Sequence, residues 1–383
     1  MYRNEAVEKY ILFLLEKSTV EAPVWNVEKT GKSNTSKWNY VDGCMIKALL
    51  DFGEISGDDR FTGYAMDFID HRVNEDGSIE GYNKKKYNLD DINAGKTLFT
   101  LYRLTGREKY KKALDAIYEQ VKEQPRTFEG SFWHKLIYPN QVWLDGFYMV
   151  QPFYMEYETA FNGHENYDDI FTQFKTARLR MKDRETGLYF HGYDASRSIF
   201  WCDPSTGLSR NFWLRSMGWF VMALIDTLEQ CEQSGFEKEC DMLKGMFRDL
   251  VDALLKFKTE NNFWYQVVDK GGTPGNYEET SGTAIMAYAL LKGARTGLLP
   301  AEYAKTGQDV FESICRRYID ENGRMLLGGI CLVAGLGPDN DRRRDGSVDY
   351  YLSEPVVEND AKGVGPFLLA YTELLRLYRD KEL

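Results

Sequence analysis

Two kinds of predicted helix alternate along this chain of 383 residues, and this alternation restricts the possible folds more than any other feature. Helices of the first kind have one apolar stripe and a charged back, which is typical of a helix with one face in water. This pattern recurs at 7–15, 61–69, 110–121 and 243–254. Helices of the second kind are apolar nearly all round, so other elements must cover them on every side. They run through 44–50, 219–225, 284–291 and 367–371.

A short turn that carries glycine leads from each buried helix to the next amphipathic one. The five turns are Ser56-Gly57, Thr105-Gly106, Asn162-Gly163, Ser234-Gly235 and Thr296-Gly297. Glycine ends a helix by adopting positive φ, and the acidic residues that closely follow most of these turns suit the first turn of the next helix. A spacing of roughly 50–70 residues between the turns indicates repeated helical hairpins.

The number of hairpins predicts the fold. The chain opens with an amphipathic helix and closes with a buried one at 364–378, so five turns give six hairpins and twelve helices. Six inner helices surrounded by six outer helices form an all-α (α/α)6 barrel, here expected as a single domain over 1–383. An open solenoid is the alternative, but neither end shows the polar capping repeat that a solenoid needs.

The connections from outer to inner helices are long and unlike one another. They cover about 19–37, 74–88, 124–140, 182–211, 259–280 and 319–362. In the barrel geometry all six emerge at one mouth, and loops of this length in a compact fold usually carry function. The sequence therefore predicts a functional site at that mouth.

The inner helices should begin at the mouth, and their first residues combine aromatic, acidic and basic side chains. The candidates are Trp38, Asn39, Tyr40, Asp90, Asp91, Trp143, Asp145, Trp213, Arg215, Trp219, Glu279 and Lys362, with His134, Lys135 and His191 from the preceding loops. Aromatic faces together with carboxylates suit a sugar as ligand. Taken singly, each residue also fits a structural role, such as a core tryptophan or an aspartate in the first turn of a helix.

Asp145 is the one carboxylate in the otherwise apolar, aromatic run 142–150. Burying an unpaired charge costs several kcal/mol or forces the group to take up a proton. A carboxyl group kept protonated by apolar neighbours is what a general acid requires. The simpler interpretation of Asp145 is an aspartate that caps the start of a helix.

Composition excludes some partners and cofactors. Lys plus Arg number 48 and Asp plus Glu 59, and the net charge of −11 disfavours nucleic acid or an anionic membrane as the main partner. A small anionic ligand held by local cations stays compatible with this charge. Neither metal-ligand spacing, nor a phosphate-binding loop, nor a dinucleotide fingerprint, nor a G-x-S-x-G motif occurs, so we expect no metal and no cofactor.

The cellular compartment is predicted from the cysteines and from the apolar segments. The six cysteines lack C-x-x-C spacing and are expected to be reduced thiols. The N-terminus shows no signal-peptide pattern, and no apolar stretch is long enough to span a bilayer. We therefore expect a cytoplasmic protein; the sequence carries no signal for its oligomeric state.

Several segments carry a resemblance to a known family. The segments 88–90, 143–149 (W-L-D-G-F-Y-M), 213–219, 351–355 and 362–367 resemble the unsaturated rhamnogalacturonyl hydrolases of glycoside hydrolase family 105. The resemblance covers nearly the whole chain, although Met217 stands where the family motif R-x-N-G-W frequently has Asn. It implies an (α/α)6 barrel that acts inside the cell on pectin fragments left by lyases. The terminal 4,5-unsaturated galacturonic acid of such a fragment is linked to rhamnose.

The resemblance also implies catalytic roles. Asp145 matches the family's general acid/base, which would protonate C4 of the double bond and activate water for addition at C5. The resulting hemiketal would open and release the rest of the saccharide. Asp90 matches the second aspartate of the family, which would hydrogen-bond the sugar and, as a nearby carboxylate, help to keep Asp145 protonated. Whether Asp90 or its neighbour Asp91 faces the pocket stays open, and the match favours Asp90.

The predicted substrate-binding residues are Tyr40, His134, Lys135, Trp143, His191, Trp213, Arg215 and Trp219. We expect Lys135 and Arg215 to meet the uronate carboxylate, and two of the tryptophans, Trp213 and Trp219, to stack on the sugar ring. Three other functions remain as alternatives: an unsaturated glucuronyl hydrolase of the family 88 type on glycosaminoglycan-type fragments, a sugar epimerase, and a non-catalytic carbohydrate-binding (α/α)6 protein.

Overall fold

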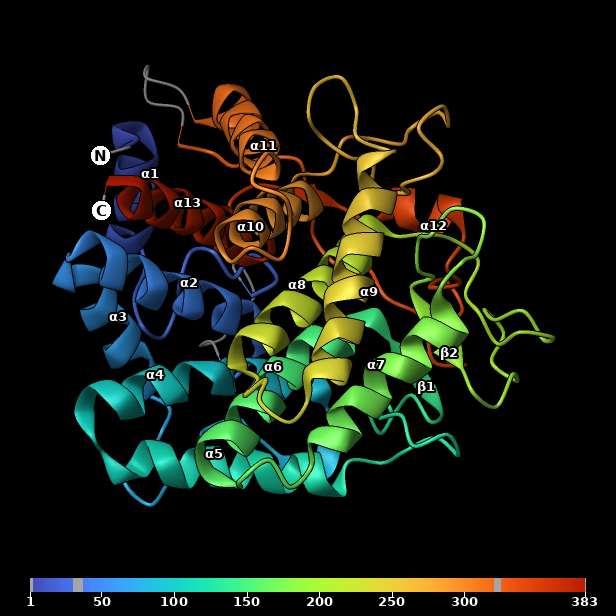
Figure 1. Cartoon of the computed structure of the whole chain (residues 1–383), viewed down its shortest axis with the longest axis horizontal. Helices are drawn as coiled ribbons and strands as arrows, with labels where there is room; N and C mark the ends of the chain where they lie inside the picture. Colours follow the sequence, from blue (N-terminus) through green and yellow to red (C-terminus); the bar gives the residue numbers. More distant parts are fainter. Residues whose placement is uncertain (1–2, 30–36, 320–324, 383) are drawn as a thin grey trace.

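A computed structural model describes residues 3–29, 37–319 and 325–382 of the chain. Within these ranges six inner helices form a ring inside six outer helices (Figure 1). The outer helices are α1 (Glu5–Glu16), α3 (Asp59–Asp70), α5 (Glu108–Glu123), α7 (Tyr167–Met181), α9 (Glu237–Leu255) and α11 (Tyr303–Tyr318). The inner helices are α2 (Tyr40–Ser56), α4 (Lys96–Thr105), α6 (Leu144–Phe161), α8 (Leu214–Gln230), α10 (Thr280–Arg295) and α13 (Ala361–Glu382). The predicted (α/α)6 barrel is confirmed.

The ring closes between the last hairpin and the first. Helix α13 packs against α10 on one side and α2 on the other, while α6 packs against α8 and against a 3-10 helix, η2 (Leu89–Gly95), that precedes α4. At the outer layer, the hydroxyl of Tyr371 in α13 accepts from the backbone N–H of Asn4 at 2.9 Å and donates to Glu8 at 2.8 Å. These contacts bring the two ends of the chain side by side (Figure 1).

The five glycine turns adopt the predicted left-handed conformation. The φ angles at Gly57, Gly106, Gly163, Gly235 and Gly297 lie between 60° and 86°. A Cβ atom built at any of these glycines would have no neighbour within 4 Å, so the backbone conformation, and not lack of space, is what favours glycine there. The turns thus link each inner helix to the next outer helix as the sequence predicts.

One inner helix begins differently from the expectation. The residues Leu89 to Gly95 form a 3-10 helix before the α-helix starts at Lys96. Close packing explains the small residues at its end: a Cβ at Gly95 would lie 2.8 Å from Ile117 and 3.0 Å from Phe153. The tighter helix lets the chain pass between its neighbours and presents Asp90 and Asp91 in its first turn.

The long connections carry the few strands of the described chain. Strand β1 (Gln141–Trp143) pairs antiparallel with β2 (Gly192–Asp194), and β3 (Ile330–Cys331) pairs with β4 (Val356–Val357). The last connection also contains a short helix that the sequence did not reveal, α12 (Val348–Ser353). Because β1 runs directly into α6, this pairing fixes the start of that helix at the mouth.

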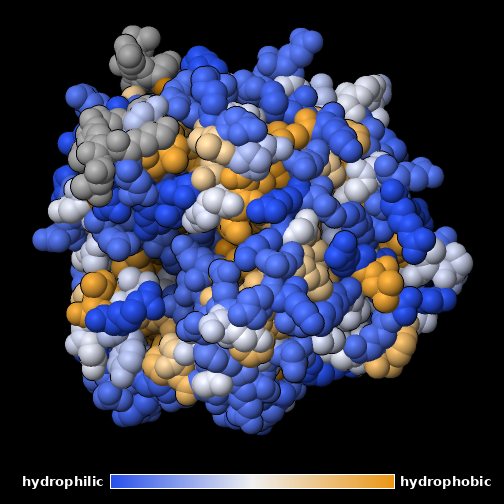
Figure 2. Space-filling view, viewed as in Figure 1, coloured by the Kyte–Doolittle hydropathy of each residue, from blue (hydrophilic) through white to orange (hydrophobic). Residues whose placement is uncertain are grey.

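The outer surface agrees with the charged backs of the amphipathic helices. Figure 2 shows a mainly hydrophilic face with scattered apolar patches. Among the described residues, no helix combines the length and the apolar composition needed to cross a lipid bilayer.

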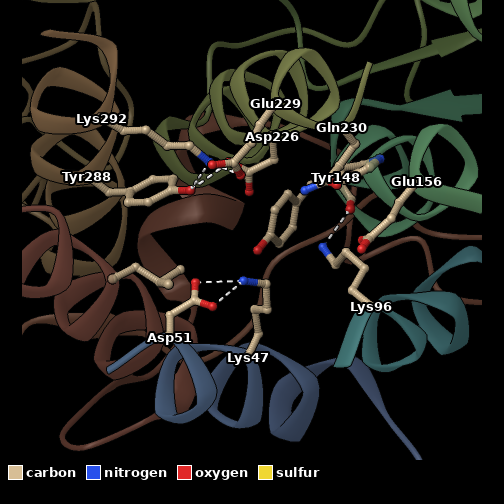
Figure 3. Close-up of a pocket in the computed structure, with 12 residues that line it drawn as sticks. Lys47, Asp51, Lys96, Tyr148, Glu156, Asp226, Glu229, Gln230, Tyr288 and Lys292 are labelled. Atoms are coloured by element: carbon tan, nitrogen blue, oxygen red, sulfur yellow. Dashed lines mark hydrogen bonds and ion pairs between the residues drawn. The ribbon is translucent and has the colours of Figure 1, made fainter. Parts of the chain in front are cut away.

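At the end of the barrel opposite the mouth, charged side chains of the inner helices form ion pairs. Lys292 contacts Asp226 and Glu229, each at 2.7 Å, and Lys47 contacts Asp51 at 2.5 Å. Figure 3 shows these side chains around a cavity of about 30 Å³, which they line from the later turns of the inner helices.

Candidate active site

Asp145 lies in the first turn of α6, where the pairing of β1 with β2 fixes its surroundings. In this pairing Trp143 is opposite Gly192, and the backbone N–H of Leu144 donates to the carbonyl of His191 at 3.1 Å. The Asp145 carboxyl oxygen Oδ2 consequently lies 3.2 Å from Nε2 of His191. The Asp145 side chain is 13% exposed and that of His191 is fully buried.

The two facing atoms of this pair have unused hydrogen-bonding capacity. Neither Oδ2 of Asp145 nor Nε2 of His191 has a well-aligned hydrogen-bond partner among the described residues, although both are buried. The other ring nitrogen of His191, Nδ1, is held by the hydroxyl of Tyr351 at 2.7 Å. A buried polar atom without a partner is unfavourable, so the site is suited to a ligand that supplies one.

Asp90 lies in the first turn of η2, which packs against α2 and α6. Its carboxylate contacts Nζ of Lys135 at 2.6 Å and Nε2 of His134 at 3.4 Å. Burial by itself would raise the pKa of Asp90, but its neighbours, with the ammonium group of Lys135 foremost, together outweigh burial, and the pKa is lowered. Burial also lowers the pKa of His134 to about 4. At neutral pH the group therefore consists of an ionised Asp90, an uncharged His134 and a charged Lys135.

Asp91 has a different environment from Asp90. Burial and, next, the negative charge of Asp90 raise the pKa of Asp91 to about 6. Its peptide oxygen accepts a hydrogen bond of 2.7 Å from the indole N–H of Trp38. The structure thus brings the carboxylate of Asp90, rather than that of Asp91, into contact with Lys135 and His134. Besides burial, the charge of Asp90 raises the pKa of Asp91.

A continuous aromatic wall links the two carboxylates. The ring of His134 stacks on Trp143 with centroids 4.4 Å apart, and Trp143 and His191 meet edge to face with centroids 5.6 Å apart. His191 then lies 4.8 Å from Trp213, which stacks on Tyr351 at 5.9 Å. The wall fixes both imidazoles and with them the positions of Asp90 and Asp145.

Arg215 lies on the floor of the mouth in the first turn of α8 and is only 1% exposed. Its guanidinium donates to the hydroxyl of Ser281 at 3.2 Å and to the backbone carbonyls of Cys331 and Leu332. Burial by itself would lower the pKa of Arg215, but acidic neighbours, Cys331 and Glu279 foremost, raise it above its ordinary value. It pairs with no carboxylate of the described residues, so its positive charge is available to an anionic ligand.

Tyr40 begins α2 and shares the mouth with Asp90. The ring is half-buried, and Nζ of Lys362 lies 6.0 Å from its centroid. Burial first, and then the charges of Glu28 and Asp90, raise the pKa of Tyr40 well above its usual range. Its hydroxyl is therefore a hydrogen-bond donor at any physiological pH.

Trp219 lies one helical turn beyond Arg215, deeper in the barrel. It is 2% exposed and stacks on Tyr148 at 5.0 Å, with the rings 10° from parallel. The same Tyr148 ring has Nζ of Lys96 3.3 Å from its centroid. One face of Trp219 is thus covered by protein, as is one face of Trp213 by Tyr351.

The structure adds two residues to which the sequence assigned no role. Tyr351, which holds His191, and Arg344, whose charge contributes to the low pKa of Asp90, both come from the connection between α11 and α13. The only signal was indirect: Tyr351 opens one of the resembling segments, and Arg344 ends a run of three arginines in an acidic chain. Among the described residues, no group of three or more acidic, histidine or cysteine side chains could hold a metal ion.

Comparisons with known proteins agree with this site and fold. The profile of Glycosyl Hydrolase Family 88 matches residues 17–378. A family 105 glycoside hydrolase of C. acetobutylicum ATCC 824 is 39% identical, with a TM-score of 0.88 over 97% of this chain and 98% of that one. A 24.9 kDa protein in the picA locus of Rhizobium radiobacter is 42% identical over 237 residues, which are 60% of this chain and 100% of the relative. The unsaturated rhamnogalacturonyl hydrolase YesR of Bacillus subtilis (strain 168) is 23% identical over 75% of this chain and 78% of its own length.

The predicted family is confirmed by a profile that spans nearly the whole chain and by the likeness to a family 105 enzyme along its full length. The chain is a glycoside hydrolase that belongs to the group formed by families 88 and 105.

Proposed function

We propose that this enzyme removes the terminal 4,5-unsaturated uronic acid from oligosaccharides that lyases release from pectin, with galacturonyl linked to rhamnose as its substrate. The observation that carries the proposal is the Asp145 carboxyl group. It is largely buried, its Oδ2 lacks a hydrogen-bond partner among the described residues, and a fully buried imidazole faces it at 3.2 Å. The relative YesR, named for this activity, supports the same substrate.

Asp145 supplies the proton in the chemistry that we propose. The protonated carboxyl group adds its proton to C4 of the vinyl ether, and positive charge develops on C5 and the ring oxygen. The carboxylate of Asp145 then takes a proton from a water molecule as its oxygen bonds to C5. One group thus acts first as acid and then as base.

The product of this hydration breaks down without further help from the protein. The hemiketal at C5 opens to a ketone and leaves a hemiacetal at C1. Collapse of the hemiacetal to an aldehyde releases the saccharide with a free hydroxyl group. The net reaction consumes one water molecule, and the glycosidic bond breaks although no nucleophile attacks C1.

The neighbouring residues hold the sugar and the acid in place. The hydroxyl of Tyr351 fixes His191 so that Nε2 faces Asp145. Asp90, kept ionised by Lys135, accepts hydrogen bonds from sugar hydroxyls and opposes the positive charge of the transition state. Arg215, together with Lys135, supplies the positive field for the uronate carboxylate, and the tryptophans cover the apolar faces of the ring.

We also propose a cytoplasmic location. The six cysteines are free thiols, and five of them are buried. Thiols that persist unpaired are typical of a reducing compartment. A short, lyase-generated oligosaccharide is the kind of substrate that such a compartment receives after import.

The activity is tested by following the ultraviolet absorbance of the conjugated double bond. Wild-type protein should remove the absorbance of an unsaturated galacturonyl-rhamnose disaccharide faster than that of an amino-sugar-linked unsaturated disaccharide. Faster turnover of the amino-sugar substrate would favour the glucuronyl hydrolase alternative. Binding without any change in absorbance would favour the carbohydrate-binding alternative.

The assignment of the acid is tested with a matched pair of variants. Asp145→Asn should abolish the absorbance change while sugar binding persists. Asp168→Asn should leave it unchanged, because Asp168 occupies the first turn of the outer helix α7 and is exposed. Activity of the Asp145→Asn enzyme would show that Asp145 is not the proton donor.

A further inference from the structure

Three successive arginines lie in the connection between α11 and α13, in a chain of net charge −11. Arg342 is exposed and lies over the ring of Phe200, with its Cζ 4.8 Å from the ring centroid. Arg343 pairs with Glu354 at 2.8 Å. Arg344 forms no ion pair with any described residue, which distinguishes it from its neighbour Arg343.

The guanidinium of Arg344 has most of its donors unused. Within the described ranges its side chain makes one hydrogen bond, from Nε to the hydroxyl of Tyr350, and this bond is long at 3.4 Å. A guanidinium carries five N–H donors in a planar fork that fits a carboxylate. Arg344 is half-buried, so these donors are partly screened from bulk water.

The backbone is built to admit this side chain beside the catalytic mouth. A Cβ atom at Gly335 would collide with Nη2 of Arg344 and would lie 3.1 Å from the Trp143 ring. Only glycine leaves the guanidinium room to lie across the backbone at this point, next to the aromatic wall. The positive charge of Arg344 lowers the pKa of Asp90, which places it within electrostatic range of the site.

The proposed function assigns two other cations of the mouth, Lys135 and Arg215, to the carboxylate of the terminal uronate. Lys135 is bound to Asp90 at 2.6 Å. Arg215, 1% exposed, donates to Ser281 and to backbone carbonyls on the floor. Arg344 is less buried than Arg215 and comes from a connecting loop, so it belongs to the rim. A terminal sugar that reaches Asp145 occupies the bottom of the mouth. The rest of the saccharide must therefore extend outward past the rim.

We propose that Arg344 binds a carboxylate of the leaving saccharide and so favours substrates that carry a second uronate over the galacturonyl-rhamnose disaccharide. The inference rests on the proposed function. Lyase fragments of an alternating uronate–rhamnose chain carry a second uronate two rings beyond the bond that breaks. An unsaturated digalacturonate carries it on the next ring. Either places a carboxylate outside the terminal subsite, where a rim arginine meets it.

The test compares kcat/KM for an unsaturated galacturonyl-rhamnose disaccharide with kcat/KM for the corresponding tetrasaccharide and for unsaturated digalacturonate. Arg344→Ala should lower the ratio of tetrasaccharide or digalacturonate to disaccharide by about tenfold or more, the effect of losing a charged hydrogen bond. Arg344→Lys should keep part of the preference, because it keeps the charge but loses the fork. Gly335→Ala should lower the ratio as well, since it displaces the guanidinium and leaves its charge in the chain.

Arg342→Ala is the matched control, because it removes one neighbouring positive charge from an exposed position. Its ratios should equal those of wild type, and melting temperatures of all variants verify folding. The proposal is wrong if Arg344→Ala leaves both ratios unchanged, or if Arg342→Ala lowers them equally. If wild-type enzyme acts on none of the three substrates, the proposed function itself is wrong, which is a different result from unchanged ratios in an active enzyme.

Discussion

Two adjacent aspartates, Asp90 and Asp91, show how neighbouring residues acquire different roles. Lys135 lowers the pKa of Asp90, while burial and the charge of Asp90 raise that of Asp91 to about 6. Only Asp90 contacts the cationic and imidazole groups of the site. The covalent chemistry of the two residues is identical, so the difference arises from the fold alone.

The first prediction uses this pair as its own control. Asp90→Asn should lower kcat by about 100-fold or more, because it removes the charge that opposes the cationic transition state. Asp91→Asn should lower kcat by less than about fivefold, since its carboxylate contacts neither His134 nor Lys135 in the structure. Steady-state kinetics of both variants test this prediction. A larger decrease in kcat for Asp91→Asn than for Asp90→Asn would show that Asp91 is the residue that acts in the site.

The second prediction concerns stability and pH. A carboxyl group whose pKa rises from 3.8 to about 6 on folding stabilises the native state below pH 3.8, and this stability is lost as the pH rises through about 6. Asp91→Asn removes the titrating carboxyl group, so the variant does not lose this stability as the pH rises. The free energy of unfolding of the variant, relative to wild type, should therefore increase between pH 4 and pH 7 in denaturant titrations. A difference that does not depend on pH would contradict the shifted pKa.

The site residues that the sequence predicted lie in a different kind of segment from those that it did not predict. Asp90, Asp145, Trp143 and Arg215 lie at helix starts, where the local pattern fixes their position relative to the barrel. Tyr351 and Arg344 reach the mouth through a connection of more than forty residues, and a helical period says nothing about where such a segment folds. Their placement depends on contacts that are distant in sequence, such as the hydrogen bond between Tyr351 and His191.

At the scale of elements, the glycine turns set where each inner helix ends. Gly106 ends α4 with φ of 67°, and its N–H donates to the carbonyl of Tyr102 at 2.8 Å. An L-residue adopts this conformation at a cost of about 1 kcal/mol. The turn sequence therefore carries both the stop signal and the change of direction between the two layers.

The third prediction compares two glycines of opposite role. Gly106→Ala should lower the free energy of unfolding by about 1 kcal/mol, because alanine is strained at positive φ. Gly63→Ala should raise it by about 0.5–1 kcal/mol, because Gly63 is exposed within α3 and a Cβ there meets nothing within 4 Å. Chemical denaturation measures both, and equal effects would contradict the conformational argument.

The elements themselves were largely predictable. One-sided and all-round apolar patterns separate outer from inner helices, and the five turns give the number of hairpins. The start of the second inner helix was predicted less well, because Leu89 to Gly95 form a 3-10 helix under packing from α2 and α6. Helix α12 was missed because six residues are too short for a periodic pattern to stand out.

At the scale of the whole molecule, the two ends of the barrel have different chemistry. The mouth has a carboxyl group and two imidazoles with unused hydrogen-bonding capacity, whereas ion pairs line the opposite end (Figure 3). Lys96 lines the cavity at this opposite end: its Nζ donates to the carbonyl of Tyr148 at 3.1 Å and lies against the ring on which Trp219 stacks.

The fourth prediction concerns this lysine. Burial lowers the pKa of Lys96 from 10.5 to about 7, so its stabilising contribution is present above pH 10.5 and is lost as the pH falls to about 7. Lys96→Met should therefore stabilise the protein most at pH 6, with a gain that shrinks as the pH approaches 10. Denaturant unfolding at several pH values measures it; a gain that grows with pH would contradict the depressed pKa.

The central claim is that Asp145 drives hydration of the double bond, and the fate of a solvent proton tests it most directly. The enzyme is incubated in D2O with an unsaturated galacturonyl-rhamnose disaccharide, and NMR follows C4 of the uronate during the initial rate. Wild-type enzyme should place one deuterium at C4 for each rhamnose released, and Asp145→Asn should do neither. Release of rhamnose while the double bond stays intact, or deuteration at an undiminished rate without the carboxyl group of Asp145, would contradict the account.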